Sequence, residues 1–485
     1  MTGSRTLAED LAAFAAQVRR DGPPDDVADS VAMRVLDTVG ICVAAADLPT
    51  SRAARRWVAD TGGTAQAGAV GVADRVPAAA AAFVNGVLAH SLDYDDTHLP
   101  SVLHPSASVV PAALAAGERA RATGAQVVSA IAVGLEVCVR LGMAGYDADS
   151  GNSMFFEFGQ HATSICGAMG SAVAAAMLLG ADERGIVDAL GVAASMSSGI
   201  IEANRTGGTV KRVHCGWAAR AGVSAAELVS YGLTGPPTAL EGRFGFFQAW
   251  LHGAEVHLAE VTDGLGDRWA VPDIFFKPYP ANHFTHAGID AAIRLRERGL
   301  DPAQIEHIEL RVAEAPHRTI GQPIDVKRAP ETGYMAQFSG PYAVVAGLLG
   351  GGGLGVGLAD FTDDLARDPE RRRLMALVDV TIDERCTEIF PRQFPAILTV
   401  RTRDGRLWSE EVLENRGGPG WPLTFDELAE KFTDNSSRLL DAQSVGALKD
   451  ACGRIGELPE ISGLVEGLRG IDPLDQQNST DPLDE

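Results

Sequence analysis

Positive charge is scarce in this sequence. It contains 41 Lys and Arg residues against 64 Asp and Glu residues, which gives a formal net charge of -23. Nucleic acids and anionic membranes are bound by basic surfaces, so this balance argues against both as partners. A small anion can still be bound if cations are concentrated locally. The few lysines and histidines set among glycines and aromatics are therefore more informative than the total charge.

Closely spaced cysteines are absent. The six cysteines are Cys42, Cys138, Cys166, Cys215, Cys386 and Cys452. None is paired with another at a spacing of two to four residues, so a zinc site built on cysteine pairs is not expected. Most lie in apolar runs, which is typical of buried thiols in a reducing compartment.

The sequence also lacks a long uninterrupted apolar run. The first residues, MTGSRTLAEDLAAF, carry acidic side chains where a signal peptide would be apolar. The most apolar stretch, Ala125–Leu141, contains Glu136 and Arg140 and is short for a membrane span. We therefore expect no transmembrane helix and a cytoplasmic location.

Alanine and glycine are abundant, and they favour closely packed helices joined by tight turns. A chain of 485 residues is too long for one ordinary core, so two domains are expected. In the first two-thirds, apolar residues recur at helical spacing, as at Leu7, Leu11, Phe14 and Val18. Further helices are predicted at residues 76–88, 109–119, 126–141, 165–179 and 216–230. Their nearly all-apolar faces indicate the centre of a large bundle.

The pattern changes near residue 270. Apolar and polar residues alternate at 308–312 and 378–382, and more weakly at 396–400, which predicts half-buried strands. Asp404-Gly405 is a hairpin turn signal. Helices are predicted between these strands, at 287–298, 337–349 and 363–377.

These patterns predict a mainly α protein with three parts. Residues 1–269 and 414–470 form an all-helical domain, and residues 270–413 form a smaller α+β domain inserted into it. Helix returns after Pro422, so the later segment is assigned to the helical domain, and a third small domain would show the same pattern. The tail 471–485 is acidic, has few apolar residues and is predicted to be disordered.

The densest polar cluster lies between two alanine-rich helices. It runs from His90 to His98 as HSLDYDDTH and continues to His104. Three aspartates and three histidines within fifteen residues are costly to place near a core unless they bond one another or a ligand. A metal site, a polar connecting loop and a catalytic site all remain open, because the spacing is not diagnostic.

Three further segments combine polar groups with glycines or aromatics. His161 opens a buried helix, where free amides favour an anion, although it could equally cap its own helix. Lys211 precedes a helix that begins near Gly216. Lys277 stands in FFKPYP, where aromatics and prolines can partly desolvate the amine, and a solvated surface lysine is less typical there.

Taken together, these segments resemble the signature of the MmgE/PrpD family. The resemblance is carried by HSLDYDDTH with HPSASVVPAALAAGE, by KRVHCGWAARAGVSAAELVSYGLTGPPTALEGRFGFF, by FKPYPANHFTHAGIDAA and by NRGGPGWPLTFDELAEKF. The motifs occur in the family's order over about residues 10 to 460. The sequence is therefore identified as a member of this family.

The resemblance implies an all-helical domain built from both chain ends and an α+β lid inserted between them. It also implies a homodimer that needs no metal and no organic cofactor. Members of the family are decarboxylases, dehydratases and epimerases of small carboxylic acids. A small anionic carboxylate is thus the expected substrate, and neither nucleic acid nor a membrane is an expected partner.

The family's decarboxylase pattern also implies a set of site residues. The pattern implies the catalytic residues Asp93, His104, His161, Lys211 and Lys277 and the substrate-binding residue Thr97. Tyr279 and His283 are predicted in addition to bind substrate, as part of the wall of the site. The gap between the Thr97 and His104 positions is one residue longer than in that pattern.

The chemistry of these reactions suggests a role for each group. Charge builds on a carbon next to a carboxylate, and cations placed there lower the barrier. Lys211 and Lys277 are assigned to substrate carboxylates. His104 and His161 are the candidate acid and base, because imidazole titrates near neutral pH. Asp93 is expected to orient a neighbouring His or Lys, or to act as a base itself.

Four classes of function remain after this step. The first is a cofactor-independent lyase, either a decarboxylase or a dehydratase, acting on a small di- or tricarboxylic acid. The second is an epimerase of an imino or related dicarboxylate. A non-catalytic anion-binding protein and a metallohydrolase are the others, and turnover assays and metal analysis distinguish them.

Overall fold

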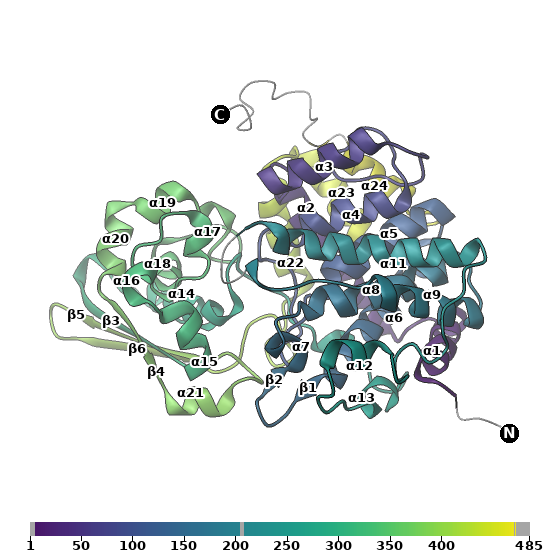
Figure 1. Ribbon diagram of the computed structural model, residues 1–485. Helices are drawn as coiled ribbons and strands as arrows, with labels where there is room; N and C mark the ends of the chain where they lie inside the picture. The colour runs from purple at the N-terminus through teal and green to yellow at the C-terminus, as the bar shows by residue number, and fades with distance from the viewer. Residues whose placement is uncertain (1–4, 204–207, 470, 472–485) are drawn as a thin grey trace. The chain divides into compact units, whose positions relative to one another are not determined.

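A computed structural model describes residues 5–203, 208–469 and 471 of the 485-residue chain. The protein is mainly α-helical and has a small four-stranded sheet. Its contacts form two compact units (Figure 1). The helical unit comprises residues 1–91, 95–274 and 436–485, and the sheet unit comprises residues 92–94 and 275–435.

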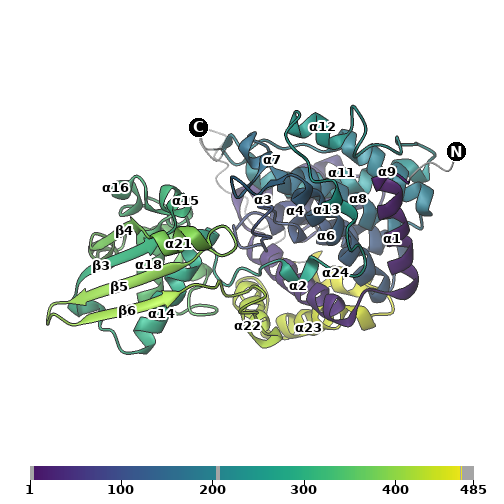
Figure 2. The same ribbon diagram turned by 90° about the horizontal axis from the view of Figure 1, so that it is seen from below.

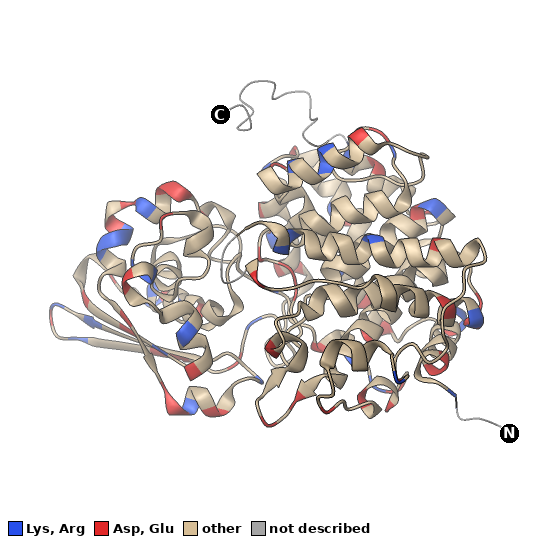
Figure 3. Cartoon of the chain, viewed as in Figure 1, with Lys and Arg blue, Asp and Glu red and all other residues tan. Residues whose placement is uncertain are grey.

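The helical unit is built around α8 (Ala162–Leu178), which contains no charged residue and is buried along almost its whole length. It is tan throughout in Figure 3, where charged residues are coloured. Helices α5 (Ser106–Ala120), α6 (Gly124–Ala144), α9 (Glu183–Met196) and α11 (His214–Ser230) pack against it. Burial on every side explains why its sequence shows an apolar run and no amphipathic stripe.

Other helices of this unit complete the bundle. They are α1 (Leu7–Asp21), α2 (Asp25–Ala44), α3 (Pro49–Thr61), α4 (Ala78–Ala89), α7 (Met154–Glu157), α12 (Phe246–Leu251), α13 (Ala259–Thr262), α23 (Ala442–Gly453) and α24 (Ser462–Arg469). A two-stranded ribbon joins β1 (Tyr146–Asp147) to β2 (Asn152–Ser153). The 3-10 turns are η1 (Val210–Val213), η2 (Val271–Asp273) and η7 (Ile455–Glu457). The last helices return to the bundle, since α23 packs on α2 and the Gly124 amide donates to the Leu458 carbonyl at 2.8 Å.

Glycine permits the close contact between α4 and α11. A Cβ atom on Gly86 would lie 2.7 Å from the Cα of Gly216. No side chain fits between the two backbones at that separation, so the two helices meet glycine to glycine. This contact matters for function because the same two helices carry residues of the candidate site at their ends.

The sheet unit has strand order β4-β3-β5-β6. Its strands are β3 (Ile305–Val312), β4 (Val378–Ile382), β5 (Ala396–Thr402) and β6 (Leu407–Val412). β3 is parallel to β4 and antiparallel to β5, while β5 and β6 form an antiparallel hairpin. Helices α14 (His286–Glu297) and α18 (Gly340–Leu349) cover one face (Figure 2). The predicted strands and the Asp404-Gly405 hairpin turn are confirmed.

The remaining elements of the sheet unit are short, apart from α22. They are α15 (Glu314–Pro316), α16 (Ile324–Lys327), α17 (Gly333–Ala336), α19 (Asp363–Arg367), α20 (Pro369–Met375), α21 (Glu384–Ile389), α22 (Phe425–Ser436), the 3-10 turns η3 (His283–Thr285), η4 (Pro302–Gln304) and η6 (Leu358–Asp360), and the π-turn η5 (His317–Gly321). The single helix predicted over 363–377 is wrong, because it is split at Asp368. Pro369 cannot donate an amide hydrogen bond to the preceding turn and restricts the residue before it.

Helix α6 is longer than the sequence predicts, which bears on whether it could span a membrane. It extends over 21 residues, longer than the predicted stretch, and is long and apolar enough to cross a membrane. Length therefore does not exclude a span, contrary to the sequence argument. However, 94% of its most apolar window is buried inside the protein, as in a core helix of a soluble bundle. Its Glu136 and Arg140 pair with each other at 2.6 Å.

The contacts also assign the segments near the C-terminus. Residues 414–435, predicted with the helical domain, group with the sheet unit, and residues from 436 group with the helical unit. Of the predicted disordered tail 471–485, every residue except Ile471 lies outside the described residues. The role of the sheet unit as a lid stays a prediction.

We expect Gly86→Ala to destabilise the helical unit, because the new methyl group would meet the α11 backbone. Overpacking of this kind costs about 1–3 kcal/mol and lowers the melting temperature. Gly446→Ala is the matched control, because a Cβ atom there meets nothing within 4 Å and alanine favours a helix. Equal melting temperatures for Gly86→Ala and the parent protein would contradict the close contact.

Candidate active site

The ends of four helices bring four histidines together in the helical unit. His90 ends α4, His104 precedes α5, His161 caps the start of α8 and His214 begins α11. The His90 ring centroid lies 5.4 Å from that of His104 and 5.5 Å from that of His161, and the His161 and His214 centroids are 5.0 Å apart. The histidine cluster is therefore continuous from α4 to α11.

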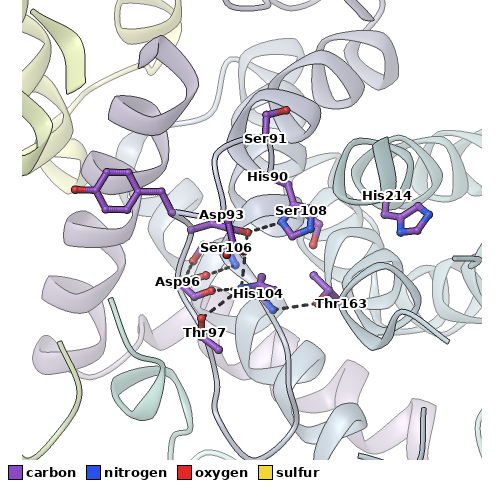
Figure 4. Close-up of polar contacts among 12 residues, drawn as sticks. His90, Ser91, Asp93, Asp96, Thr97, His104, Ser106, Ser108, Thr163 and His214 are labelled. Atoms are coloured by element: carbon purple, nitrogen blue, oxygen red, sulfur yellow. Dashed lines mark hydrogen bonds and ion pairs between the residues drawn. The ribbon is translucent and has the colours of Figure 1, made fainter. Parts of the chain in front are cut away.

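His104 is held by neighbouring groups on several sides (Figure 4). Its Nδ1 donates to the Asp96 carbonyl at 2.7 Å, and the Thr97 hydroxyl is 3.3 Å from the same atom. Its backbone amide donates to the Thr163 hydroxyl at 3.2 Å. Because Nδ1 carries the donated proton, Nε2 is the atom that can accept or deliver a proton in a reaction.

The loop that leads to His104 ends in a tight turn. His98 and Leu103 form an antiparallel bridge, with the His98 amide donating to the Leu103 carbonyl at 2.8 Å. Val102 takes a left-handed conformation with φ 54°, which closes the turn. His104 is therefore brought into the cluster in spite of the longer spacing.

A buried ion pair anchors the same loop. Arg34 Nη1 lies 2.8 Å from Asp96 Oδ2, and both side chains are almost fully buried. Ser106 donates to the same carboxylate through its hydroxyl at 2.5 Å and its amide at 3.2 Å. Arg34 also donates to the Val271 and Ile274 carbonyls at 2.9 and 2.8 Å. The Asp96 carboxylate is thus fully engaged as a structural anchor.

His161 and His214 share a hydrogen bond and remain neutral. Their Nδ1 atoms are 2.9 Å apart, so one donates and the other accepts. Burial, followed by the positive charge of His90, Lys211 and His214, lowers the pKa of His161 well below its usual value. Burial also lowers the pKa of His214 to about 4. Near pH 7, His161 is therefore an imidazole base and not an acid.

Lys211 lies beside this histidine pair. It is half-buried in η1, directly before α11, and its positive charge contributes to the lowered pKa of both His161 and His214. A cation next to neutral imidazoles can attract an anion.

The sheet unit contains a second buried group of charges. Lys277 is 1% exposed, and its Nζ lies 2.9 Å from the Asp93 carbonyl and 3.2 Å from Asp93 Oδ1. Lys431 on α22 is also fully buried and donates to the carbonyls of Tyr94 and Lys277 at 3.2 and 2.8 Å. Asp93 therefore has a lysine as its neighbour, one of the two partners expected for it.

Tyr279 and His283 also lie in the sheet unit, both buried. The Tyr279 hydroxyl donates to Asp290 at 2.6 Å, and Arg416 donates to that hydroxyl at 3.2 Å. Burial raises the pKa of Asp290 to about 6. The His283 ring packs 4.6 Å from the ring of His286, measured between centroids. Whether Tyr279 and His283 bind substrate stays a prediction.

The predicted site residues thus fall into two groups. The helical unit contains Thr97, His104, His161 and Lys211, and the sheet unit contains Asp93, Lys277, Tyr279 and His283. Sequence reasoning assigned no role to His90, Asp95, His214 or Lys431. All four lie inside motifs already noted, but nothing in the spacing shows which side chains would meet.

Within residues 5–203, 208–469 and 471, no three His, Cys, Asp or Glu residues are arranged to hold a metal ion. All six cysteines belong to this part of the chain and are buried and unpaired with one another.

Comparison with known proteins gives matches over most of the chain. The model of the MmgE/PrpD N-terminal domain matches residues 9–259, and that of the C-terminal domain matches residues 279–452. Cis-aconitate decarboxylase of Homo sapiens is 31% identical over 417 residues, which cover 82% of this chain and 81% of that protein. Cis-aconitate decarboxylase of Aspergillus terreus is 27% identical over 481 residues, which cover 95% and 96%.

The buried histidines should make the helical unit sensitive to acid. Burial, and then the charge of Arg34, lowers the pKa of His98 to about 4. The unfolded chain binds a proton there near pH 6.5, so between these values it holds more protons than the folded state. The free energy of unfolding therefore falls as pH falls, by about 2 kcal/mol from pH 7 to pH 5 for this group.

We expect His98→Asn to lose less thermal stability than the parent protein between pH 7 and pH 5. Melting temperatures measured by circular dichroism at both pH values give the two losses. His257→Asn is the control, because His257 is exposed, and it should match the parent. If the loss for His98→Asn is as large as that of the parent, then His98 is not buried in its neutral form.

Proposed function

Because this chain belongs to the MmgE/PrpD family, we propose that it is a lyase that removes CO2 from a small unsaturated tricarboxylate, with cis-aconitate the first substrate to test. The observation that carries this proposal is the group formed by half-buried His104, buried neutral His161 and half-buried Lys211 in the helical unit. It supplies proton transfer and a cation for a carboxylate in one place. The decarboxylase relatives support the direction of the reaction.

The chemistry requires an acid as well as a cation. As the bond to the departing carboxylate breaks, its electron pair moves through the double bond toward a carbon next to another carboxylate. That carbon then takes a proton, and CO2 leaves. Lys211 stabilises the charge that develops, because a preorganised cation in a buried site is worth more than in water.

His104 suits the role of the acid. Its Nδ1 lies 3.9 Å from the Asp95 carboxylate, and a negative charge at that distance stabilises an imidazolium. The proton moves from His104 Nε2 to carbon, and solvent returns it after the product leaves. His161 in its neutral form accepts a hydrogen bond or removes a proton, and Thr97 donates a hydrogen bond.

Lys277 is proposed as a second carboxylate-binding group. Its almost complete burial keeps water away from the ammonium group, which strengthens its attraction for an anion. Asp93 holds the Nζ atom in place when no substrate is bound. In this proposal a substrate carboxylate replaces part of that interaction.

The direct test of the proposed reaction is NMR of the purified protein with cis-aconitate in D2O. We expect loss of one carboxylate as CO2 and one deuterium in the product. Citrate, 2-methylcitrate and iminodisuccinate serve as comparison substrates. Release of water only, or deuterium exchange at the α-carbon with no other product, would replace decarboxylation by dehydration or epimerisation.

Lys211→Ala should lower kcat/KM by about 100- to 1000-fold, the usual effect of removing one well-placed electrostatic group. Lys211 is half-buried at the start of α11, so the fold should persist, as circular dichroism can verify. Lys449→Ala removes a lysine on α23 and is the matched control. Parent-like turnover in Lys211→Ala would exclude it from carboxylate binding.

Lys277 needs a paired test, because its removal leaves the Asp93 carboxylate buried. Lys277→Met alone should cost about 3–5 kcal/mol of stability. Lys277→Met with Asp93→Asn should recover much of that stability and still lose at least about 100-fold in kcat/KM. A stable double variant with full activity would show that the pair serves only the fold.

A further inference from the structure

His90 and Asp95 form a buried pair, and the mechanism above gives His90 no role. His90 Nδ1 lies 2.6 Å from Asp95 Oδ2, and both side chains are almost fully buried. A carboxylate only accepts hydrogen bonds, so Nδ1 donates and the lone pair of the neutral ring is on Nε2. That Nε2 atom is buried and has no hydrogen-bond partner among the residues that the structure describes.

The Oδ2 atom of Asp95 lies close to two histidines, His90 and His104. Asp95 Oδ2 is the atom that accepts from His90, and it also lies 3.9 Å from His104 Nδ1. The His90 and His104 rings are neighbours, with centroids 5.4 Å apart. The two imidazoles therefore compete for a single negative charge, and their protonation is coupled.

Other titratable groups surround this arrangement. They are His161 on α8, His214 on α11, Lys211 on η1 and Asp96 in the same loop. The thiols of Cys42 and Cys215 are also near Asp95, and burial raises the pKa of both, which keeps them uncharged. Asp96 is paired with Arg34, whereas the Asp95 carboxylate lies against both His90 and His104.

A buried nitrogen without a partner is costly, at about 1–3 kcal/mol. The His104 and His161 rings lie beside His90, with centroids 5.4 and 5.5 Å away. The His90 ring that donates to Asp95 is therefore part of the histidine cluster.

We propose that His90 and His104 share Asp95 as their counter-ion, and that His90 thereby sets the pH range in which His104 acts as the acid. His90 is a positioning residue, since it acts through Asp95 and His104. When both rings are neutral, the first proton bound is stabilised by Asp95, and a second proton is opposed by the first. This inference rests on the proposed function only for the role of His104 in turnover.

Two variants distinguish the effect of the Asp95 carboxylate from that of the His90 ring. Asp95→Asn removes the negative charge, so the protonation midpoint of His104 should move to lower pH by about one unit or more. His90→Asn keeps a donor at the Nδ1 position but removes the titrating ring. No second titrating ring then competes for the Asp95 charge, and the His104 midpoint should move to higher pH.

Histidine-selective 15N NMR titration of the full-length protein measures these midpoints without any turnover. The His104→Gln variant identifies the His104 resonance, because that resonance is lost. The His90→Gln variant is a control: its amide lies at the Nε2 position, so it no longer donates to Asp95. A folded His90→Asn protein with retained melting temperature makes the comparison valid. If it fails to fold, Asp95→Asn alone still tests the shared counter-ion by the shift of the His104 midpoint.

Opposite shifts in the two variants would support the inference, and an unchanged His104 midpoint in both would overturn it. If the parent protein also decarboxylates cis-aconitate, the alkaline limb of its kcat/KM profile should follow the same shifts. Shifted midpoints without turnover of cis-aconitate would instead overturn the proposed substrate and leave the coupled pair standing.

Discussion

The buried ion pair between Arg34 and Asp96 is the interaction on which the site in the helical unit depends. Its two side chains are almost fully out of water, and the Asp96 carboxylate also accepts from Ser106 at the start of α5. Removing one partner of such a pair leaves a buried charge uncompensated, which is far more costly than losing a surface pair. The pair fixes the loop between α4 and α5, and the backbone carbonyl of Asp96 fixes the His104 ring.

The same low-polarity surroundings determine the chemistry of the histidines. Desolvation disfavours charge, so His161 and His214 are neutral at pH values where exposed histidines are partly protonated. His104 differs because Asp95 lies close to it. A single buried cluster can thus contain imidazoles suited to accept a proton and one suited to deliver it, although all are the same residue type.

In the sheet unit, two buried lysines are stabilised by different kinds of partner. Lys277 is paired with Asp93, whereas Lys431 is satisfied largely by backbone carbonyls and by the face of Tyr94, whose ring centroid is 3.8 Å from its Nζ. Carbonyl oxygens and the face of an aromatic ring attract an ammonium group through partial charges and the ring quadrupole. Lys431 therefore orders the chain around Lys277, and Lys277 is paired with the Asp93 carboxylate.

Much of the secondary structure follows from the sequence alone. The strands at 378–382 and 396–400 and the hairpin at Asp404-Gly405 need only the alternation of side chains and a turn residue, which are local properties. The prediction of one helix over 363–377 was wrong because it ignored a local feature, Pro369, which separates two helices. The motifs also identified the family and marked His104, His161, Lys211 and Lys277, because each stands among residues that are unusual for a surface.

Tertiary structure alone decided which of these groups meet. The sequence separates His161 from His214 by 53 positions, and no periodicity indicates that their Nδ1 atoms share a hydrogen bond. Arg34 and Asp96 are 62 positions apart, so the sequence could not predict that they form an ion pair. The sequence by itself determined the elements, the family and the residue types of the site. The packing of helix ends decided the partners of these groups and the lowered pKa of His161 and His214, because these depend on distance and desolvation.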